Sequence, residues 1–216
     1  QIDSGLRPFL MQEISQFLLS LLNGLSGWEA CAVVLAIAYL LLAAKESIYC
    51  WYCALVSTAI FTFLFWDVSL LMESALNVYY MIMAVYGWHQ WRYGGKEHSG
   101  IPIRALDSKQ HLLIIGAVII ISLISGLLLS QYTNAAWPYV DSFTTWGSVI
   151  TTVMVAKKVL ENWLYWLVID SVSIPLYIDR GLYLTAILFM VYIVIVVVGY
   201  LSWRQRYNSQ QSLANA

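Results

Sequence analysis

Long apolar runs alternate with short polar segments along most of the chain. Seven of these runs approach the roughly 20 residues that a helix needs to cross a hydrocarbon core about 30 Å thick. They cover residues 27–44, 48–65, 69–91, 111–130, 140–156, 163–179 and 182–202. A membrane β-barrel would show period-two alternation in segments of about ten residues, and these unbroken runs do not. The pattern therefore predicts an all-α polytopic membrane protein with seven transmembrane helices.

The stretch before the first run, FLMQEISQFLLSLLNGLSG, has a different pattern. Its apolar residues recur at helical spacing around Gln12, Glu13 and Gln16, which makes one helical face apolar and the other polar. This predicts an N-terminal amphipathic helix on the membrane surface within residues 1–26. A further span across residues 9–25 is the alternative. A cleavable signal peptide is not expected, because no A-x-A-like site follows the apolar stretch.

Composition agrees with this pattern and excludes several kinds of protein. Of the 216 residues, 61% are hydrophobic and only 11% are charged, which is too apolar for a soluble domain of this size. The net charge of −1 comes without a basic patch for nucleic acid. The chain has no glycine-rich phosphate loop, so it is not expected to be an ATP-driven pump by itself. Cys50 and Cys53 lie in an apolar run without a second pair, so we expect neither a zinc nor a redox site.

Lys and Arg are distributed unevenly between the two sets of loops. The set after the first, third, fifth and seventh runs contains nine of the 11: Lys45, Arg92, Lys96, Arg104, Lys109, Lys157, Lys158, Arg204 and Arg206. The other set contains only Arg7 and Arg180. Because Lys and Arg are retained on the cytoplasmic side, this split predicts an external amino terminus and a cytoplasmic carboxyl terminus.

The two halves of the chain share a sequence pattern. YMIMAVYGWHQWR begins at Tyr80 and YIVIVVVGYLSWR at Tyr192, with Tyr, Gly, Trp and Arg at identical intervals and an offset of 112. Earlier markers, Glu46 and Trp51 against Glu161 and Trp166, have an offset of 115. We therefore expect a three-residue insertion between the two sets of markers. Both halves begin on the same side of the membrane, which predicts parallel repeats.

The predicted architecture is three helices, one linker helix and three further helices. The first repeat covers residues 27–92, and a cytoplasmic loop with the linker helix covers 93–131. The second repeat covers 132–204, and a cytoplasmic tail covers 205–216. In transporters built from such repeats, the substrate lies near the bilayer midplane between the repeats.

Two carboxylates, Glu73 and Asp170, fall deep within apolar runs. A charge at that depth costs roughly 3 kcal/mol even on lenient insertion scales, so such acids normally face a bundle interior or a water-filled path. Each acid belongs to a stripe with helical spacing, and a third stripe lies on residues 141–152. The stripes are Glu73, Asn77, Tyr80 and Ala84; Asn162, Trp166, Asp170, Ser173 and Tyr177; and Asp141, Thr145, Ser148 and Thr152. They predict the lining of a substrate path, with a proton relay as an alternative use of the acids.

Other roles for these residue types stay open. Tryptophans near the cytoplasmic ends of their runs are typical of an interfacial aromatic belt, which is the alternative for Trp163, Trp88, Trp91 and Trp203. The hydroxyls on residues 141–152 can bond across helices or back to their own backbone carbonyls. Asn77 can also serve to hold two helices together.

A lining of aromatic faces, amides, hydroxyls and carboxylates suits a particular ligand chemistry. A flat cationic ring gains from stacking, from cation–π contact and from nearby carboxylates. Amides and hydroxyls suit a sugar or a carboxamide. The lining favours a nucleoside-like molecule with a positively charged base, while plain sugars and neutral vitamins are alternatives.

Two segments carry a resemblance to a known family. ALNVYYMIMAVYGWHQW contains Asn77, Tyr80, Tyr86, Gly87, Trp88 and Trp91, and ENWLYWLVIDSVSIPLYIDRGLYLTA contains Trp163-x-x-Trp166, Asp170, Pro175, Tyr177 and the turn Gly181-Leu182-Tyr183. With these segments the chain resembles the PnuC family of bacterial nicotinamide riboside transporters, over nearly its whole length after residue 26. The resemblance implies the three-plus-one-plus-three fold shared with the SWEET sugar transporters. Many members carry Gln where this chain has Asn77, so the resemblance does not carry the family's detailed contacts over to that residue.

The resemblance also implies an activity. It is facilitated diffusion of nicotinamide riboside across the bacterial inner membrane, with inward flux maintained by a cytoplasmic nicotinamide riboside kinase. The partners are then this small molecule and the lipid bilayer, and homo-oligomerisation is left open. No cofactor and no enzymatic activity are expected. The expected substrate-binding residues are Trp51, Glu73, Asn77, Tyr80, Asn162, Trp163, Trp166, Asp170, Tyr177 and Tyr192.

Several alternatives to this activity are open. Thiamine, another vitamin or a sugar is an alternative substrate, with or without ion coupling. An intramembrane enzyme and a scaffold subunit are alternatives from other classes. The sequence favours neither, because it has no HExxH or GxSxG motif and a scaffold would not explain acids on two helical stripes.

Overall fold

The computed structural model describes residues 16, 26–67, 71–95, 100–133, 137–179 and 181–214, without the side chains of 71–73 and 214. The surface helix predicted within residues 1–26 therefore lies outside the described residues, apart from Gln16 and Ser26. The predicted site residue Glu73 has only its backbone described.

The described residues form seven helices, which confirms the helices that the apolar runs predict. They are α2 (Gly27–Ala44), α3 (Cys50–Asp67), α4 (Leu71–Tyr93), α5 (Ser108–Tyr132), α6 (Pro138–Ala156), α7 (Asn162–Asp179) and α8 (Tyr183–Ala214). The predicted bounds differ from these by a few residues, except at the end of α8. That helix continues through most of the segment 205–216.

Local chemistry explains where three of these helices begin. Ser26 and Glu29 form a capping box at the start of α2. Ser26 Oγ accepts from the Glu29 N–H at 3.2 Å, and Glu29 Oε2 accepts from the Ser26 N–H at 2.7 Å. Asp107 and Gln110 form the same arrangement at the start of α5. Pro138 opens α6, where its missing N–H costs no hydrogen bond.

The helices differ in how apolar they are. Four of those in the described part of the chain, α2, α3, α5 and α8, are long and apolar enough to cross a membrane. The other three, α4, α6 and α7, are the helices that carry the predicted polar stripes. Their polar residues are tolerated because their neighbours in the bundle cover one face of each helix.

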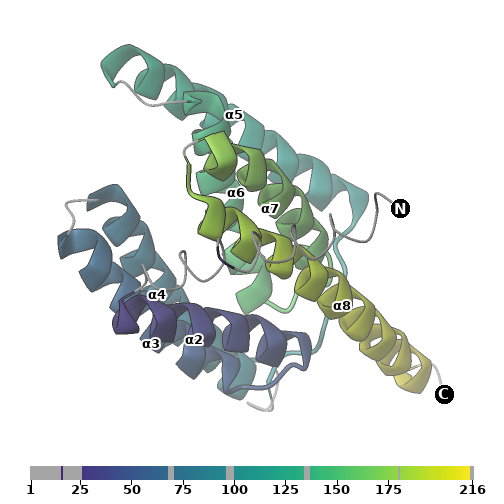
Figure 1. The fold of residues 1–216 in the computed structure, drawn as a ribbon. Helices are drawn as coiled ribbons and strands as arrows, with labels where there is room; N and C mark the ends of the chain where they lie inside the picture. The colour runs from purple at the N-terminus through teal and green to yellow at the C-terminus, as the bar shows by residue number, and fades with distance from the viewer. Residues whose placement is uncertain are drawn as a thin grey trace, which may run out of the picture.

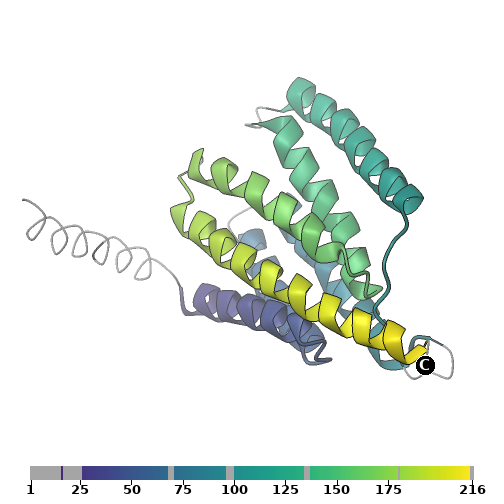
Figure 2. The ribbon, with the colours of Figure 1, turned by 90° about the vertical axis from the view of Figure 1, so that its right-hand side faces the viewer.

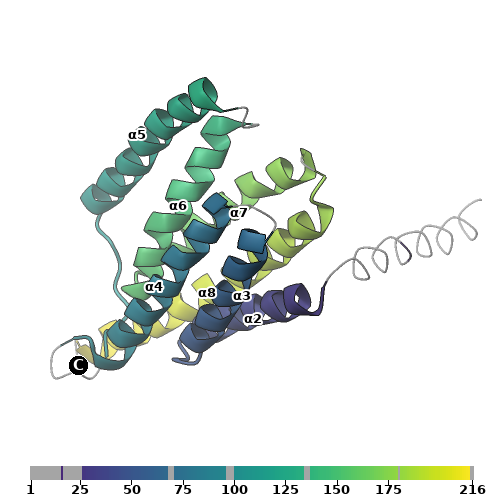
Figure 3. The ribbon, with the colours of Figure 1, turned by 90° about the vertical axis from the view of Figure 1, so that its left-hand side faces the viewer.

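Six helices form a closed ring with α5 outside it. Around the ring, α2 packs on α3, α3 on α4, α4 on α6, α6 on α7, α7 on α8, and α8 on α2. Helix α5 packs mainly on α6 and lies at the periphery in all three views (Figures 1, 2 and 3). The contacts α4·α6 and α2·α8 join the first half of the chain to the second.

The turns α2–α3 and α6–α7 have the same geometry. Helices α2 and α6 end at Ala44 and Ala156, and the next helix begins at Cys50 and Asn162. Glu46 and Lys158 both adopt left-handed backbone conformations, with φ of 54° and 49°. Such conformations are uncommon for residues other than glycine, so their recurrence at matching places in the two halves indicates equivalent turns.

The register between the halves corrects one sequence prediction. The Trp51 indole lies against Gly87, and the Trp163 indole lies against Gly199, so closely that a Cβ on either glycine would overlap the ring. Trp51 therefore corresponds to Trp163, not to Trp166. The tryptophans and the glycines then share a single offset, so the expected three-residue insertion is wrong.

Candidate functional site

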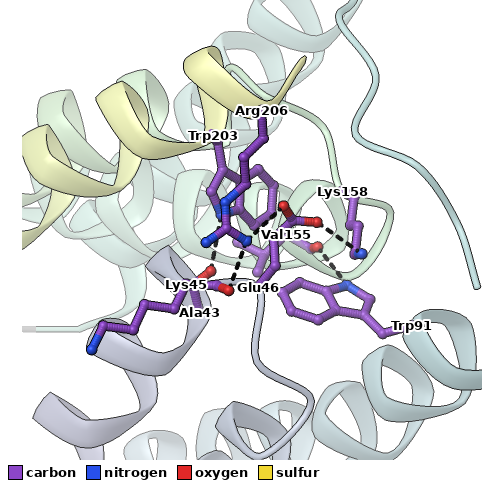
Figure 4. A network of polar contacts seen from close by, with 8 residues as sticks. All are labelled: Ala43, Lys45, Glu46, Trp91, Val155, Lys158, Trp203 and Arg206. Atoms are coloured by element: carbon purple, nitrogen blue, oxygen red, sulfur yellow. Dashed lines mark hydrogen bonds and ion pairs between the residues drawn. The ribbon is translucent and has the colours of Figure 1, made fainter. Parts of the chain in front are cut away.

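The two halves exchange indole hydrogen bonds at the end of the bundle where most of the basic residues gather. Trp91 Nε1 donates to the Val155 carbonyl at 3.3 Å, and Trp203 Nε1 donates to the Ala43 carbonyl at 2.9 Å (Figure 4). Both acceptors lie in the last turn of a helix, where carbonyls lack the usual helical partner four residues ahead. Each tryptophan thus caps a helix of the other half.

Charged groups reinforce this contact. Lys158 Nζ and Arg206 Nη1 each lie 3.0 Å from a different carboxylate oxygen of Glu46 (Figure 4). The side chains of Glu46 and Lys158 are both 13% exposed, and Lys158 Nζ lies 4.8 Å from the centre of the Trp91 ring. Removal of one partner from an ion pair shielded to this degree is costly, because it leaves a poorly solvated charge without its counter-charge. We call Ala43, Glu46, Trp91, Val155, Lys158, Trp203 and Arg206 the basic-end network.

Burial of the tryptophans excludes the interfacial-belt alternative for three of them. Trp91 and Trp203 belong to the core, and Trp163 packs edge-on against Trp203 with ring centres 5.4 Å apart. Trp163 is 1% exposed. Trp88 is only half-buried, and its Nε1 donates to the Tyr52 hydroxyl at 3.1 Å.

Several buried polar atoms near the basic-end network have no hydrogen-bond partner among the described residues: Trp51 Nε1, Trp163 Nε1, Asn162 Oδ1 and Thr151 Oγ1. Ser142 Oγ also lacks a partner, but it lies near the start of α6, where that helix meets α5, and does not belong to this set. Asn162 is fully buried, and its Nδ2 donates to the Val159 carbonyl at 2.6 Å, which leaves its oxygen available. A buried polar group without a partner costs about 1–3 kcal/mol, so this set indicates a place where a polar ligand or water binds.

A second polar group surrounds Asp170. This carboxyl is buried and lies within electrostatic range of Tyr80 on α4 and Tyr192 on α8. Tyr177 on α7 interacts with both tyrosines, and Tyr80 hydrogen-bonds Ser148 on α6. Four helices therefore contribute to one cluster. Asp170 lies eight residues into α7, roughly 12 Å along its axis, which is close to the middle of a hydrocarbon core about 30 Å thick.

The structure brings most of the predicted site residues to the inside of the ring. Buried or half-buried there are Trp51, Asn77, Tyr80, Asn162, Trp163, Trp166, Asp170, Tyr177 and Tyr192. Trp166 is half-buried and packs against the core. The side chain of Glu73 is outside the described residues. The helical stripes thus identified the inward faces of α4 and α7.

Some hydroxyls in the stripes follow the alternative role. Thr152 Oγ1 donates to the Ser148 carbonyl at 2.7 Å, and Ser173 Oγ donates to the Ile169 carbonyl at 2.8 Å. Such bonds to the preceding turn satisfy the hydroxyl within its own helix. These two hydroxyls are therefore less available to a ligand than the hydroxyl of Thr151, which lies one position beside the α6 stripe.

Glu46, Lys158 and Thr151 were all missed as functional candidates by sequence reasoning. The available signal for the first two was that opposite charges stand at equivalent places in the two halves. Among the described residues, no group of three His, Cys, Asp or Glu side chains is placed to hold a metal ion. The chemistry of the interior rests on indoles, amides, hydroxyls and one described carboxyl.

Comparison with known proteins agrees with this arrangement. The family model of the nicotinamide mononucleotide transporters matches residues 26–205. The riboflavin/roseoflavin transporter RibM of Streptomyces davaonensis is 28% identical over 141 residues, which span 63% of this chain and 66% of that protein, just under two thirds of its length. The nicotinamide riboside transporter PnuC of Escherichia coli is 22% identical over 204 residues, which span 83% of this chain and 85% of that protein.

A solved structure has the same fold. The crystal structure of the vitamin B3 transporter PnuC matches with a TM-score of 0.71 and 21% sequence identity, covering 93% of this chain and 90% of that one. These relatives are transporters and not enzymes. Since the family model matches most of its length, the chain belongs to the nicotinamide mononucleotide transporter family and is a multi-pass membrane transporter.

Proposed function

We propose that this chain takes up nicotinamide riboside by facilitated diffusion across the bacterial inner membrane. The substrate binds inside the six-helix ring, between α2–α4 and α6–α8. Its contacts come from Trp51, Glu73, Asn77, Tyr80, Asn162, Trp163, Trp166, Asp170, Tyr177 and Tyr192.

The main support for this site is the set of buried polar atoms without hydrogen-bond partners. Two indole N–H groups, of Trp51 and Trp163, and one amide oxygen, of Asn162, are buried without hydrogen bonds to the described residues. A nucleoside with a carboxamide offers donors and acceptors to all three. The Asp170 carboxyl and the tyrosine rings around it favour a cationic ring over a neutral one.

The fold supports a transport cycle based on two repeats. Helices α2–α4 and α6–α8 form the repeats, and α5 is the linker helix, as in the SWEET-like arrangement. The constant offset between the halves and the reciprocal indole bonds support this assignment. The basic-end network keeps that end closed in this conformation. Transport then requires α4 to separate from α6, or α2 from α8, at this end.

The direction of transport follows from the predicted topology. The basic end faces the cytoplasm, so the amino terminus is external and the carboxyl terminus is cytoplasmic. The substrate moves down its own concentration gradient, and a cytoplasmic kinase maintains that gradient by phosphorylating the nicotinamide riboside that has entered the cell.

A second candidate substrate is riboflavin. The relative with 28% identity is a riboflavin/roseoflavin transporter, and riboflavin is also a flat aromatic molecule with hydroxyls. The carboxyl at mid-depth favours the cationic nucleoside over this neutral vitamin.

Uptake into liposomes that contain the purified protein tests the proposal. Radiolabelled nicotinamide riboside should enter until the two concentrations are equal, and unlabelled nicotinamide riboside should compete better than riboflavin or thiamine. Asn162→Leu should abolish most uptake, whereas Asn208→Leu, a matched change on the exposed part of α8, should not. If another vitamin competes better than nicotinamide riboside, that vitamin is the substrate instead. If a sodium or pH gradient drives accumulation above equal concentrations, the protein is an ion-coupled transporter and not a uniporter.

A further inference from the structure

We infer that a pocket between α5 and α6, at the basic end, binds the headgroup and upper acyl chain of an anionic phospholipid. The pocket lies outside the six-helix ring, away from the proposed substrate site. It has a volume of about 240 Å³ and is lined by Arg104, Leu106, Ile114, Ile150, Val153, Met154, Lys157 and Val159.

The lining changes from apolar to basic between its floor and its rim. Met154 and Val159 are buried in the floor, whereas Arg104 and Lys157 are exposed at the rim. A volume of about 240 Å³ is below the roughly 300–1,000 Å³ that encloses a small-molecule ligand. The pocket therefore suits one end of a larger amphipathic molecule, with an apolar part inside and an anionic part at the rim.

The linker before α5 holds Arg104 in place. Its N–H donates to the Lys158 carbonyl at 3.0 Å, and its carbonyl accepts from the Leu160 N–H at 2.8 Å. The preceding residue, Ile103, is 4% exposed, so the side chains of 103 and 104 alternate between inside and outside. The fold therefore fixes the backbone of Arg104 and the side of the linker from which its side chain leaves.

The charges near the pocket favour an anion. Within the described residues, neither Arg104 nor Lys157 has an ion-pair partner, in contrast to Lys158 and Arg206. Two acids on the neighbouring segments bond to backbone groups instead: Asp107 accepts from the Gln110 N–H at 2.7 Å, and Glu161 accepts from the Leu106 N–H at 3.1 Å.

The location distinguishes a lipid from a soluble anion. The pocket lies where α5 begins and α6 ends, which is where a membrane-spanning helix meets the lipid headgroups. Helix α5 packs mainly on α6, and its remaining surface carries exposed Leu and Ile side chains, so acyl chains surround it. Basic pockets between helices at such a level bind anionic headgroups in membrane proteins.

Native mass spectrometry of the full-length protein, titrated with phosphatidylglycerol, tests this inference. The double variant Arg104→Gln/Lys157→Gln should bind phosphatidylglycerol roughly 30-fold more weakly. Each basic group near an anionic lipid contributes about fivefold in affinity, and the two factors multiply. Phosphatidylcholine binding should not change. The matched control is Arg92→Gln/Arg204→Gln, which removes two exposed basic groups that do not line the pocket, and it should lose less than about threefold in phosphatidylglycerol affinity.

Ile150→Trp tests the apolar part without a change in charge. The larger side chain fills the pocket, so phosphatidylglycerol binding should fall while Arg104 and Lys157 are intact. Thermal unfolding in phosphatidylcholine nanodiscs checks that each variant is folded. An equal loss in the matched control would overturn the inference in favour of general surface attraction. Equally tight binding of soluble glycerol 3-phosphate would overturn it in favour of a free phosphate site.

Discussion

Glu46 and Lys158 occupy equivalent places in two turns that are far apart in the chain, and they form an ion pair of 3.0 Å with each other. Both residues have left-handed backbone conformations, and their side chains meet between the two halves. The pair therefore lies where the proposed repeats meet, beside the reciprocal bonds of Trp91 and Trp203. Any separation of the halves at this end has to break it.

Removal of the Glu46 charge should loosen this end. Cys50 follows the Glu46 turn and is fully buried, so its alkylation by a membrane-impermeant maleimide reports opening. In a background with Cys31→Ser and Cys53→Ser, Glu46→Gln should raise the Cys50 labelling rate about tenfold or more, which corresponds to about 1.4 kcal/mol. The exchange Glu46→Lys/Lys158→Glu should restore part of the protection of Cys50.

The control for this experiment is Asp179→Asn, at an exposed residue outside the network. Equal labelling of Cys50 in Glu46→Gln and in this control would contradict the role of the network.

Alanine at Gly199 or Gly87 should destabilise the protein. The new Cβ would overlap the indole of Trp163 or Trp51 and force these buried rings to move. Overpacking of this kind typically costs about 1–3 kcal/mol. Thermal unfolding of the purified variants measures the effect.

Gly116→Ala is the matched control for these two substitutions. Gly116 also lies within a helix, and a Cβ there meets no atom within 4 Å. This change should leave stability unchanged or raise it by roughly 0.5–1 kcal/mol, because alanine favours helix more than glycine does. A similar loss for all three variants would show that close contact with the indoles is not the cause.

Substitution of Trp166 should weaken substrate binding. Stacking or cation–π contact with a desolvated aromatic substrate contributes about 1–2 kcal/mol, so Trp166→Leu should lower nicotinamide riboside affinity about tenfold or more. Trp166→Phe should lose less because it keeps a ring. Calorimetry on purified variants measures both affinities, with thermal stability as the control. If Trp166→Leu binds nicotinamide riboside as tightly as the wild type, Trp166 contributes to helix packing and not to substrate binding.

Asp170→Asn should discriminate between charged and neutral ligands. Nicotinamide riboside is cationic, whereas its reduced form has the same shape and no charge on the ring. Loss of a carboxylate near the ring should weaken binding of the cationic form by about tenfold and binding of the neutral form by much less. Equilibrium binding of the two forms gives the ratio. An equal loss for both would mean that Asp170 acts as a hydrogen-bonding group and not as a charge.

A reporter fused after Ala216 should behave as cytoplasmic. Nine of the 11 basic residues lie in the loops predicted to share that side, and such residues are retained there during insertion. A reporter that is accessible from outside would reverse the proposed topology and would contradict the predicted number of spans.

Helices and their inward faces were predictable because both depend on local patterns. The length of an apolar run sets the span, and helical periodicity places Asn77 with Tyr80 and Asn162 with Asp170, whatever the neighbouring helices are. The four-position match between the segments 80–92 and 192–204 likewise predicted the offset between the halves, because the matching side chains lie within a few turns of one helix.

Only the tertiary structure decided what those faces meet. A tryptophan near a helix end has the same sequence signature in a lipid-facing belt and in a core, and burial of Trp91 and Trp203 depends on the helix that approaches from the other half. The correspondence of Trp51 with Trp163 likewise required the positions of the glycines on neighbouring helices. Glu46 and Lys158 pair because two equivalent turns meet in space, and no local pattern in the chain encodes a contact between residues so distant in sequence.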